Sequence, residues 1–407
     1  MNIVVIGAGQ AAAQTVVSLR QFGSDDDIQI VGEEPAPPYQ RPPLSKAYMK
    51  GEMDEARLYL RPNEWYAENN VELLLSQRAI SVDTATATVK LDNGKTLPYD
   101  RLVIATGSRP RQLPVPSANL KNVFDLRTLD DVQRIREQLS SEKKLAIIGA
   151  GYIGLEAAAV AGQLGLEVTV IEMAERILAR VTSPVISAFY QSVHESHGVN
   201  FFTNARLSAL RGKDGAIVSA VLEDGAEIDA DIALVGIGIL PNDTIAADAG
   251  IECQDGIVVD RDGRTNNPAV FAAGDCARRP LVHYSGSARL ESVHNAIEQG
   301  KLVAAAILDR PRPREEAPWF WSDQYDLKLQ IAGLSVGFND HVIRGDIEAR
   351  KFAVFYFDDE KLLAVDAVGA PGEFLQAKKW IADGQTPDRS RLKDASVSIK
   401  EIAQDMK

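Results

Sequence analysis

The first 34 residues contain the pattern that most constrains the fold of this chain. Residues 3–6 are apolar, as in a buried parallel strand, and the sequence GAGQAA at residues 7–12 then matches G-x-G-x-x-A. A helix is expected over residues 12–20 and a second buried strand over residues 28–31, followed by Glu33. An ordinary βαβ unit could share parts of this pattern, but the complete order favours a dinucleotide-binding unit.

Each position of this unit has a physical role in holding a pyrophosphate. Gly7 permits the tight turn after the strand, and Gly9 lets the backbone approach the phosphates. Ala12 keeps the helix close to the sheet. The unpaired N–H groups of the helix N-terminus attract the anion. Glu33 stands where a carboxylate accepts hydrogen bonds from ribose hydroxyls.

The same pattern recurs 142 residues later along the chain. A strand over residues 144–148 precedes the sequence GAGYIG at residues 149–154, and a helix is expected over residues 155–164. A further strand over residues 168–171 ends at Glu172. Two dinucleotide sites in one chain indicate redox chemistry, for which the usual pair is FAD and NAD(P)H.

The acid at the second site bears on the choice between NAD and NADP. Glu172 has no arginine beside it, whereas NADP-dependent enzymes usually place one here for the 2′-phosphate. This favours NADH, although Arg176 and Arg180 lie close enough in sequence to leave NADP open.

Composition excludes several function classes. The formal net charge of −13 argues against a broad nucleic-acid-binding surface. No apolar run reaches the ~18 residues that a membrane span needs, and Met1 leads almost directly into a strand, which leaves no room for a signal peptide. The only cysteines, Cys253 and Cys276, fit a reducing compartment and exclude an internal four-cysteine iron–sulfur cluster. We expect a cytoplasmic protein with no bound metal.

The rest of the first domain can be outlined from apolar runs and turn residues. A helix is expected over residues 64–77, and a hairpin turns at Asn93-Gly94. The strand over residues 102–105 ends at Thr106-Gly107, where the chain leaves the domain. We expect the polypeptide to return to the first domain near Gly238. A later strand ends in Gly274-Asp275, where Asp275 can accept hydrogen bonds from the hydroxyl groups of a polyol.

The last 90 residues contain no dinucleotide-binding pattern. Strands are expected over residues 328–332, 351–357 and 362–368, and a helix over residues 373–382. The predicted fold class is therefore α/β, with two Rossmann-like dinucleotide-binding domains and a C-terminal α+β domain. The predicted boundaries are 1–110 with 242–317 for the FAD-binding domain, 111–241 for the NAD-binding domain, and 318–407 for the C-terminal domain.

Two charged residues are candidates for catalysis, each with a simpler alternative. Lys46 could hold positive charge near a flavin and stabilise its reduced form, or it could be a solvated lysine that begins a helix. Glu156, near the start of the second predicted helix, could contact the nicotinamide end of NADH, or it could simply favour the helix N-terminus.

Five motifs in order make the whole chain resemble the FAD-dependent NADH–ferredoxin reductases that serve bacterial oxygenases. They are GAGQAA, RPPLSK at residues 41–46, ATG at residues 105–107, GAGYIGLE at residues 149–156, and TNNPAVFAAGDCA at residues 265–277. WFWSDQYD at residues 319–326 extends the resemblance into the tail. The resemblance implies a glutathione-reductase-like fold.

The resemblance also implies the cofactor-binding residues. On the FAD side they are Gly7, Gly9, Gln10, Ala11, Ala12, Glu33, Arg41, Lys46, Ala79, Ala105, Thr106, Gly107, Arg127, Gly274, Asp275 and Val293. Around NADH they are Gly149, Gly151, Tyr152, Ile153, Gly154, Glu156 and Glu172, with Gly238 at the return to the first domain. Trp321 matches a tail aromatic that approaches the flavin.

The expected activity is hydride transfer from NADH to FAD, followed by single-electron transfer to an external [2Fe–2S] ferredoxin that feeds an oxygenase. Relatives with a redox-active cysteine carry it near RPPLSK, where this chain has Ser45 and Lys46. An NADH oxidase, or a flavoprotein resembling apoptosis-inducing factor, are the alternatives. An acidic ferredoxin would need basic residues to dock on, and the candidates, which could equally be solvated charges, are Arg310, Arg312, Arg314, Lys378 and Lys379.

Overall fold

The structure is a computed structural model that describes residues 1–406. These residues form two compact units. The first unit comprises residues 1–40, 55–109 and 239–316, and the second comprises residues 41–54, 110–238 and the chain from residue 317 onward. No helix within the described residues combines the length and apolar character needed to cross a membrane.

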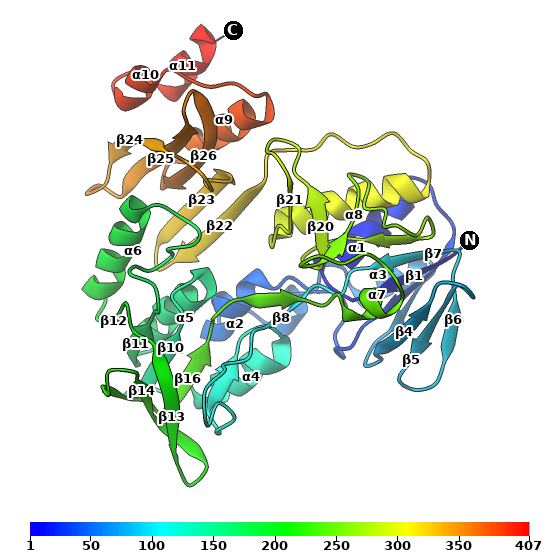
Figure 1. Cartoon of the computed structure of the whole chain (residues 1–407), viewed down its shortest axis with the longest axis horizontal. Coiled ribbons are helices and arrows are strands. Elements are labelled where there is room, and N and C mark those ends of the chain that lie inside the picture. Colours follow the sequence, from blue (N-terminus) through cyan, green and yellow to red (C-terminus); the bar gives the residue numbers. More distant parts are fainter. Residues whose placement is uncertain (407) are drawn as a thin grey trace. The chain divides into compact units, whose positions relative to one another are not determined.

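The first unit contains two long helices, several short ones and three small sheets around a parallel sheet (Figure 1). Its elements are β1 (Asn2–Ile6), α1 (Gln10–Gln21), β2 (Asp27–Val31), η2 (Glu55–Arg57), α3 (Asn63–Glu68), β3 (Val71–Leu74), β4 (Ala79–Asp83), β5 (Thr88–Leu91), β6 (Thr96–Pro98), β7 (Arg101–Ile104), β8 (Ser108–Pro110), β17 (Ile239–Pro241), α7 (Thr244–Asp248), β18 (Ile257–Val258), β19 (Val270–Ala272), β20 (Ala277–Pro280), β21 (Ser287–Ala288) and α8 (Val293–Ile307).

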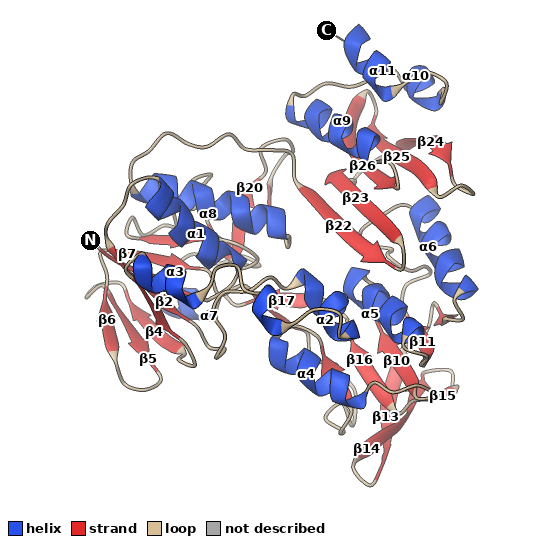
Figure 2. Ribbon diagram, turned by 180° about the vertical axis from the view of Figure 1, so that it is seen from behind, coloured by secondary structure: helices blue, strands red, loops and turns tan. Residues whose placement is uncertain are grey.

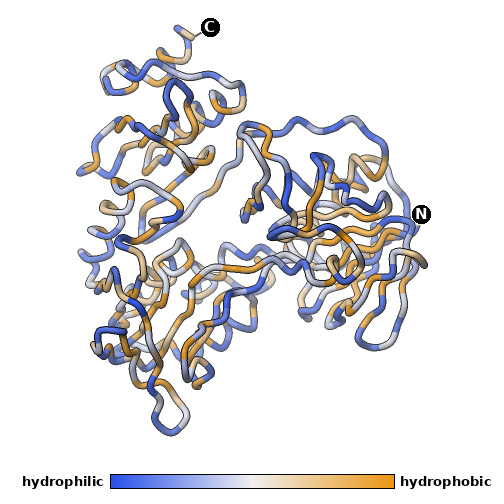
Figure 3. The backbone as a smooth tube through the Cα atoms, viewed as in Figure 1, coloured by the Kyte–Doolittle hydropathy of each residue, from blue (hydrophilic) through white to orange (hydrophobic). Residues whose placement is uncertain are grey.

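The central sheet of this unit confirms the predicted strands and has five parallel strands in the order β19-β7-β1-β2-β3. Both faces are covered, so alternate residues of β1 enter different cores. Ile3 and Val5 pack in the cluster that includes α1 and α8, and Val4 and Ile6 pack in the cluster that includes β5 and β6. Figure 3 shows the resulting hydrophobic colouring along these strands.

Two helix predictions in this unit differ from the structure. The predicted helix over residues 64–77 is wrong: α3 ends at Glu68, Asn70 adopts φ +51°, and Val71–Leu74 pairs in parallel with β2 as β3. The sequence also predicts a helix over residues 289–308, but α8 begins at Val293, four residues later, because the Ser292 hydroxyl caps it by accepting from Asn295 N–H.

The second unit contains a parallel sheet, a small antiparallel sheet and a larger antiparallel sheet near the C-terminus (Figure 2). Its elements are η1 (Pro42–Ser45), α2 (Ala47–Lys50), β9 (Val123–Asp125), α4 (Leu129–Gln138), β10 (Lys144–Ile148), α5 (Tyr152–Gln163), β11 (Glu167–Ile171), α6 (Pro184–Ser196), β12 (Asn200–Phe202), β13 (Leu207–Lys213), β14 (Ala216–Leu222), β15 (Glu227–Asp229), β16 (Ile232–Val235), β22 (Trp319–Gln324), β23 (Leu327–Gly333), β24 (Asp340–Asp346), β25 (Lys351–Asp358), β26 (Lys361–Val368), α9 (Pro371–Ala382), α10 (Arg389–Lys393) and α11 (Ile399–Asp405).

The two main sheets of this unit have the expected types. The parallel sheet runs β12-β11-β10-β16-β9, so the second βαβ unit is confirmed as β10, α5 and β11. The antiparallel sheet runs β22-β23-β26-β25-β24, and α9 packs on it. The predicted strands at residues 328–332, 351–357 and 362–368 correspond to β23, β25 and β26, whereas β22 and β24 were not predicted.

A buried polar cluster ties the start of α6 to the C-terminal sheet inside the second unit. Asp366 of β26 is 1% exposed, and its carboxylate accepts hydrogen bonds from the Thr182 hydroxyl and from the Tyr356 hydroxyl, the latter at 2.7 Å. The Tyr356 hydroxyl also lies 2.8 Å from Ser183 Oγ. Burial raises the pKa of Asp366 to about 6, because the interior disfavours the charged form.

The raised pKa predicts a pH-dependent stability. The folded chain holds a proton on Asp366 more tightly than the unfolded chain does, so this stabilisation is complete below about pH 4 and is lost as pH rises through 6. The variant Asp366→Asn should therefore gain stability relative to wild type by about 1–2 kcal/mol more at pH 8 than at pH 5. Urea unfolding at both pH values measures this difference. Asp326→Asn, at a carboxyl group that is 76% exposed, is the control, and an equal response of both variants would contradict the assignment.

Candidate functional site

The first glycine loop connects β1 to α1 and has the shape of a phosphate cradle. Gly7 has φ +111°, and a Cβ there would lie 2.1 Å from the carbonyl oxygen of Ala105, so only glycine fits. Gly9 caps α1 with ordinary backbone angles, and a Cβ there would meet nothing within 4 Å. The first turn of α1 has neither an acidic residue nor a side-chain cap. The loop therefore leaves open backbone N–H groups and space, as a pyrophosphate needs.

The acid expected at this site lies at the surface. Glu33 follows β2, is 70% exposed and lies 3.5 Å from the Arg78 guanidinium. Ala79, another predicted FAD residue, begins β4. Gln10, Ala11 and Ala12 form the first turn of α1, so this helix begins two residues earlier than predicted.

The carboxyl ends of β7 and β19 bring a second set of predicted residues to the same sheet edge. Ala105, Thr106 and Gly107 follow β7, and Gly274 and Asp275 follow β19, its parallel neighbour. Gly274 has φ +85°, and a Cβ there would lie 3.0 Å from Ala11 Cβ.

Two residues that were not predicted hold this edge in place. The Thr106 hydroxyl donates to Asn242 O at 2.6 Å, and the Asn242 amide donates back to Thr106 O at 3.0 Å. The Ser108 hydroxyl donates to Asp275 Oδ2 at 3.0 Å. Ser108 follows the ATG motif directly, and this proximity is the only signal by which the sequence could have identified it.

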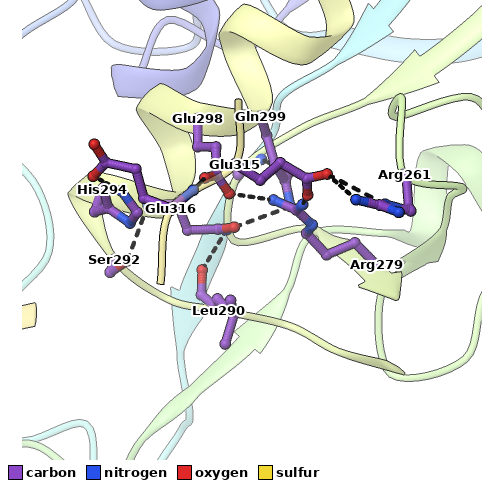
Figure 4. Close-up of polar contacts among 11 residues, drawn as sticks. Arg261, Arg279, Leu290, Ser292, His294, Glu298, Gln299, Glu315 and Glu316 are labelled. Atoms are coloured by element: carbon purple, nitrogen blue, oxygen red, sulfur yellow. Dashed lines mark hydrogen bonds and ion pairs between the residues drawn. The ribbon is translucent and has the colours of Figure 1, made fainter. Parts of the chain in front are cut away.

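Polar side chains gather around α8, among them Glu298 and Gln299 of the helix and Arg279 and Glu315 from other segments (Figure 4). Gln299 Oε1 accepts from Gly274 N–H at 2.6 Å, and the Gln299 amide donates to Asn295 at 3.3 Å. Arg279, 3% exposed, is held between Glu298 and Glu315. Val293, the predicted FAD contact, is the first residue of α8. None of the buried members of this network was predicted.

The second glycine loop repeats the geometry of the first. Gly149 has φ +103°, and a Cβ there would lie 2.5 Å from Gly236 O, while a Cβ on Gly154 would lie 2.4 Å from Gly149 O. Gly151 caps α5 with ordinary backbone angles, and a Cβ there would meet nothing within 4 Å. The protein itself thus requires glycine at Gly149 and Gly154 but leaves the space at Gly151 open, which fits a second dinucleotide.

Glu172 has a structural role in this loop that the sequence did not reveal. Its Oε2 accepts from Ala150 N–H at 2.7 Å, and its Oε1 accepts from Ala174 N–H at 2.8 Å. The carboxylate therefore holds the glycine loop against the end of β11. Each oxygen has a second lone pair, so contact with a ribose hydroxyl is still possible.

The other residues predicted around NADH differ in their exposure and in their neighbours within the second unit. Ile153 is 43% exposed at the start of α5. The Tyr152 ring is 4.9 Å from the Phe320 ring of β22, and burial raises the pKa of the Tyr152 phenol. Gly238 has φ +105°, with the Arg180 and Arg111 side chains beside it.

Lys46 and Glu156 form an ion pair inside the second unit. Lys46 Nζ lies 2.7 Å from Glu156 Oε2, with the side chains 19% and 4% exposed. Glu156 Oε2 also accepts from the Ser45 hydroxyl at 2.6 Å, and Oε1 accepts from the Ser322 hydroxyl at 2.7 Å. Three donors thus surround one carboxylate.

The geometry contradicts the simpler interpretation of Glu156 and part of that of Lys46. Lys46 does begin a helix, since it stands at the N-cap of α2, but it is not solvated, because its ammonium is paired and mostly covered. Glu156 is the fifth residue of α5, which has no acidic residue in its first turn, so it does not serve the helix N-terminus. A mostly buried, paired lysine can offer positive charge to a neighbouring group in a low-dielectric setting.

Arg41, Arg127 and Trp321 complete the predicted residues of the second unit. Arg41 Nη1 donates to the carbonyl oxygen of Arg127 at 2.6 Å. Trp321 lies on β22 beside Ser322, with its ring 5.6 Å from that of Trp319. The predicted site residues therefore lie in two groups, one in each unit. Arg41, Lys46 and Arg127, predicted on the FAD side, belong to the second unit.

The two cysteines are poorly suited to redox chemistry. Burial raises the pKa of Cys253 to about 11 and also raises the pKa of the fully buried Cys276 thiol. Because the thiolate is the reactive form, neither is activated for thiol exchange.

The basic residues considered for docking differ in the groups that they contact. Arg312 makes two bonds to Asp262, at 2.7 and 2.9 Å, and Arg310 donates to Phe22 O at 3.1 Å. Lys378 lies over the Trp319 ring at 5.3 Å. Arg312 is thus largely neutralised by its partner.

Comparison with known proteins agrees with the geometry of the two loops. Residues 1–300 match the family described as pyridine nucleotide-disulphide oxidoreductase, and residues 319–403 match the reductase C-terminal family. The chain is 41% identical to putidaredoxin reductase CamA of Pseudomonas putida, over 98% of this chain and 96% of that protein. It is 39% identical to rhodocoxin reductase of Rhodococcus erythropolis, over 98% and 94%.

Solved structures give the same result. The crystal structure of the covalent putidaredoxin reductase–putidaredoxin complex matches with a TM-score of 0.97 and 40% identity, covering 100% of this chain and 98% of that one. The ferredoxin reductase for the CYP199A2 system from Rhodopseudomonas palustris matches with a TM-score of 0.96 and 37% identity, covering all of both chains. The predicted fold and family are confirmed: the chain belongs to the pyridine nucleotide-disulphide oxidoreductases and, within them, to the ferredoxin reductases related to putidaredoxin reductase.

Proposed function

We propose that this protein is an NADH-dependent ferredoxin reductase that uses FAD and delivers electrons to a [2Fe–2S] ferredoxin of an oxygenase system. The observation that carries the proposal is the pair of glycine loops, in which Gly9 and Gly151 leave open space that the fold itself does not need. The full-length similarity to putidaredoxin reductase supports the acceptor. When bound, FAD supplies the change from two-electron to one-electron chemistry, accepting hydride from NADH and passing single electrons to the cluster.

The first unit would hold most of FAD. The open N-terminus of α1 and the Gly9 backbone would bind its pyrophosphate, and Glu33 would accept from its ribose. Asp275, oriented by Ser108, would accept from polyol hydroxyls. Gln299 keeps Gly274, and with it the Asp275 backbone, in place. Ala79 and Val293 would provide apolar contacts.

The second unit would hold NADH through the loop that ends at α5. Gly151 would let the backbone approach the pyrophosphate, and Glu172 would hold both the loop and the ribose. Lys46, held by Glu156, would place positive charge where the reduced cofactor gains negative charge. Trp321 would cover the reacting groups from the tail. We also propose the division into an FAD-binding domain (1–110 and 242–317), an NAD-binding domain (111–241) and a C-terminal domain (318–407).

The cysteines bear on the location of the enzyme, and the basic residues bear on the docking of its ferredoxin. The unactivated cysteines suit a reducing, cytoplasmic location. The ferredoxin would dock by charge, with Arg310, Arg314, Lys378 and Lys379 as the remaining candidates once Arg312 is assigned to Asp262.

The test compares electron acceptors. With NADH and a [2Fe–2S] ferredoxin, the purified protein should reduce the cluster much faster than it reduces oxygen. Rapid peroxide formation that added ferredoxin does not lower would instead identify an NADH oxidase. Slow turnover with every acceptor, together with a long-lived reduced protein, would indicate a protein that responds to NADH without delivering electrons.

NADH should be preferred over NADPH. Glu172 would accept from a 2′-hydroxyl but would repel a 2′-phosphate, so kcat/KM should favour NADH by at least about tenfold. Steady-state kinetics with both cofactors measures the ratio. Equal values would show that Arg176 or Arg180 accommodates the phosphate and that Glu172 does not discriminate.

A further inference from the structure

A continuous chain of hydrogen bonds leads from α6 to the buried carboxylate of Glu156. His194 Nε2 lies 2.8 Å from Gln324 Oε1, and the Gln324 amide donates to Ser322 Oγ at 3.2 Å. Ser322 in turn donates to Glu156 Oε1 at 2.7 Å. His194, Gln324 and Ser322 are all 0% exposed. They come from α6 and β22, elements far apart in sequence that meet within the second unit.

All the hydrogen bonds in this hydrogen-bond chain run in one direction. The Gln324 carbonyl oxygen can only accept, so His194 Nε2 carries a hydrogen, and His194 Nδ1 accepts from the Tyr325 hydroxyl at 3.1 Å. Burial lowers the pKa of His194 to about 4, which keeps the ring neutral. Because the Gln324 amide occupies a lone pair of Ser322, the Ser322 hydrogen is directed toward Glu156. Every donor along the chain therefore points to the same carboxylate.

We infer that Gln324 and His194 are positioning residues for the Lys46–Glu156 pair. Through Ser322, they hold Glu156 as the anion that fixes Lys46, although neither contacts Lys46 itself. A buried hydroxyl without a fixed partner could rotate away and leave the carboxylate with one donor fewer. This inference rests on the proposed role of Lys46 beside FAD and adds the group of residues that keeps the lysine in place.

The test uses variants that break the chain without a large change in volume. Gln324→Met removes both hydrogen bonds at similar side-chain length. Ser183→Ala is the matched control. Ser183 is also buried and hydrogen-bonded in the same unit, but its partner is Tyr356, which is not part of the hydrogen-bond chain. Each variant is made in the wild-type background and in the Glu156→Gln background, and the flavin midpoint potential of the holoenzyme is measured at pH 8.

Loss of a donor leaves more of the negative charge of Glu156 unneutralised, and this opposes reduction of a nearby flavin. Gln324→Met should lower the reduction equilibrium constant about threefold, or about 14 mV for two electrons. Ser183→Ala should change nothing, and Gln324→Met should have no effect in the Glu156→Gln background. An equal shift in both backgrounds, an upward shift, or no shift would overturn the inference.

A second readout does not depend on the flavin. Nitrogen-15 NMR of the histidine rings should show His194 as one neutral tautomer, with its hydrogen on Nε2, and Gln324→Met should shift the Nε2–H signal, because this group loses its hydrogen-bond acceptor. If the nitrogen-15 signals of His194 are unchanged in Gln324→Met, the proposed hydrogen-bond chain does not exist. If the NMR result holds but even Lys46→Met leaves the potential unchanged, the role of Lys46 at the flavin fails and the inference fails with it, while the hydrogen-bond chain itself remains.

Discussion

Alanine at Gly151 should weaken NADH binding by about 100-fold or more, while FAD stays bound at one per chain. The structure offers a free space for the added Cβ and an ordinary backbone conformation, so the protein alone should tolerate the change. Only a pyrophosphate lying against this backbone would collide with the methyl group. A loss of about 2.7 kcal/mol, within the range for overpacking, corresponds to the 100-fold effect.

Stopped-flow reduction of the bound flavin at increasing NADH concentrations measures this affinity. Gly162→Ala is the matched control, since Gly162 lies in α5, the helix that Gly151 caps, and its added Cβ also meets nothing within 4 Å. Gly9→Ala is the reciprocal variant, which should fold but be purified with little FAD. If Gly151→Ala binds NADH normally, the second loop does not hold the pyrophosphate. FAD loss in Gly151→Ala would reverse the assignment of the two loops.

The second large effect is expected at Lys46. Lys46→Met should make the flavin harder to reduce, by about tenfold in the equilibrium constant, which corresponds to about 1.4 kcal/mol. It should also slow hydride transfer and destabilise the chain by about 3 kcal/mol or more, because Glu156 is left as a buried charge without its cation. Redox titration against a dye, stopped-flow reduction and urea unfolding measure the three effects.

The double variant Lys46→Met/Glu156→Gln separates electrostatics from folding. Replacing the charge of Glu156 should restore much of the stability, since no uncompensated charge remains in the interior. Hydride transfer should remain slow, because the positive charge is still missing. If the double variant recovers both stability and wild-type reduction kinetics, Lys46 serves only the fold.

The parallel sheets could be predicted because their strands are buried on both faces. Residues 3–6 and 145–148 are continuous apolar runs followed directly by glycine loops, so both strands and both loops were placed correctly. Segments with mixed composition were harder to assign. Val71–Leu74 was included in a helix because its apolar residues have no clear period, although Asn69-Asn70 is a turn signal that marks the end of α3. β24 was missed because it is a polar edge strand.

The candidate site was predictable where a motif carried it and not where tertiary contacts formed it. Gly7, Gly9, Gly149 and Gly151 followed from spacing alone. The pairing of Lys46 with Glu156 joins residues 110 positions apart, and Ser322 reaches the same carboxylate from the tail. No local pattern specifies such a contact. The sequence indicated candidate residues, and packing determined which of them meet.

The central claim, two-electron uptake and one-electron delivery, is tested most directly by an anaerobic titration. A catalytic amount of the holoprotein is mixed with excess oxidised [2Fe–2S] ferredoxin, and NADH is added in measured portions while the cluster absorbance is followed. The proposed function predicts two ferredoxins reduced for each NADH consumed, with much slower reduction when Gly151→Ala replaces the wild type at limiting NADH. Consumption of NADH only after oxygen is admitted, with the cluster still oxidised, would contradict it.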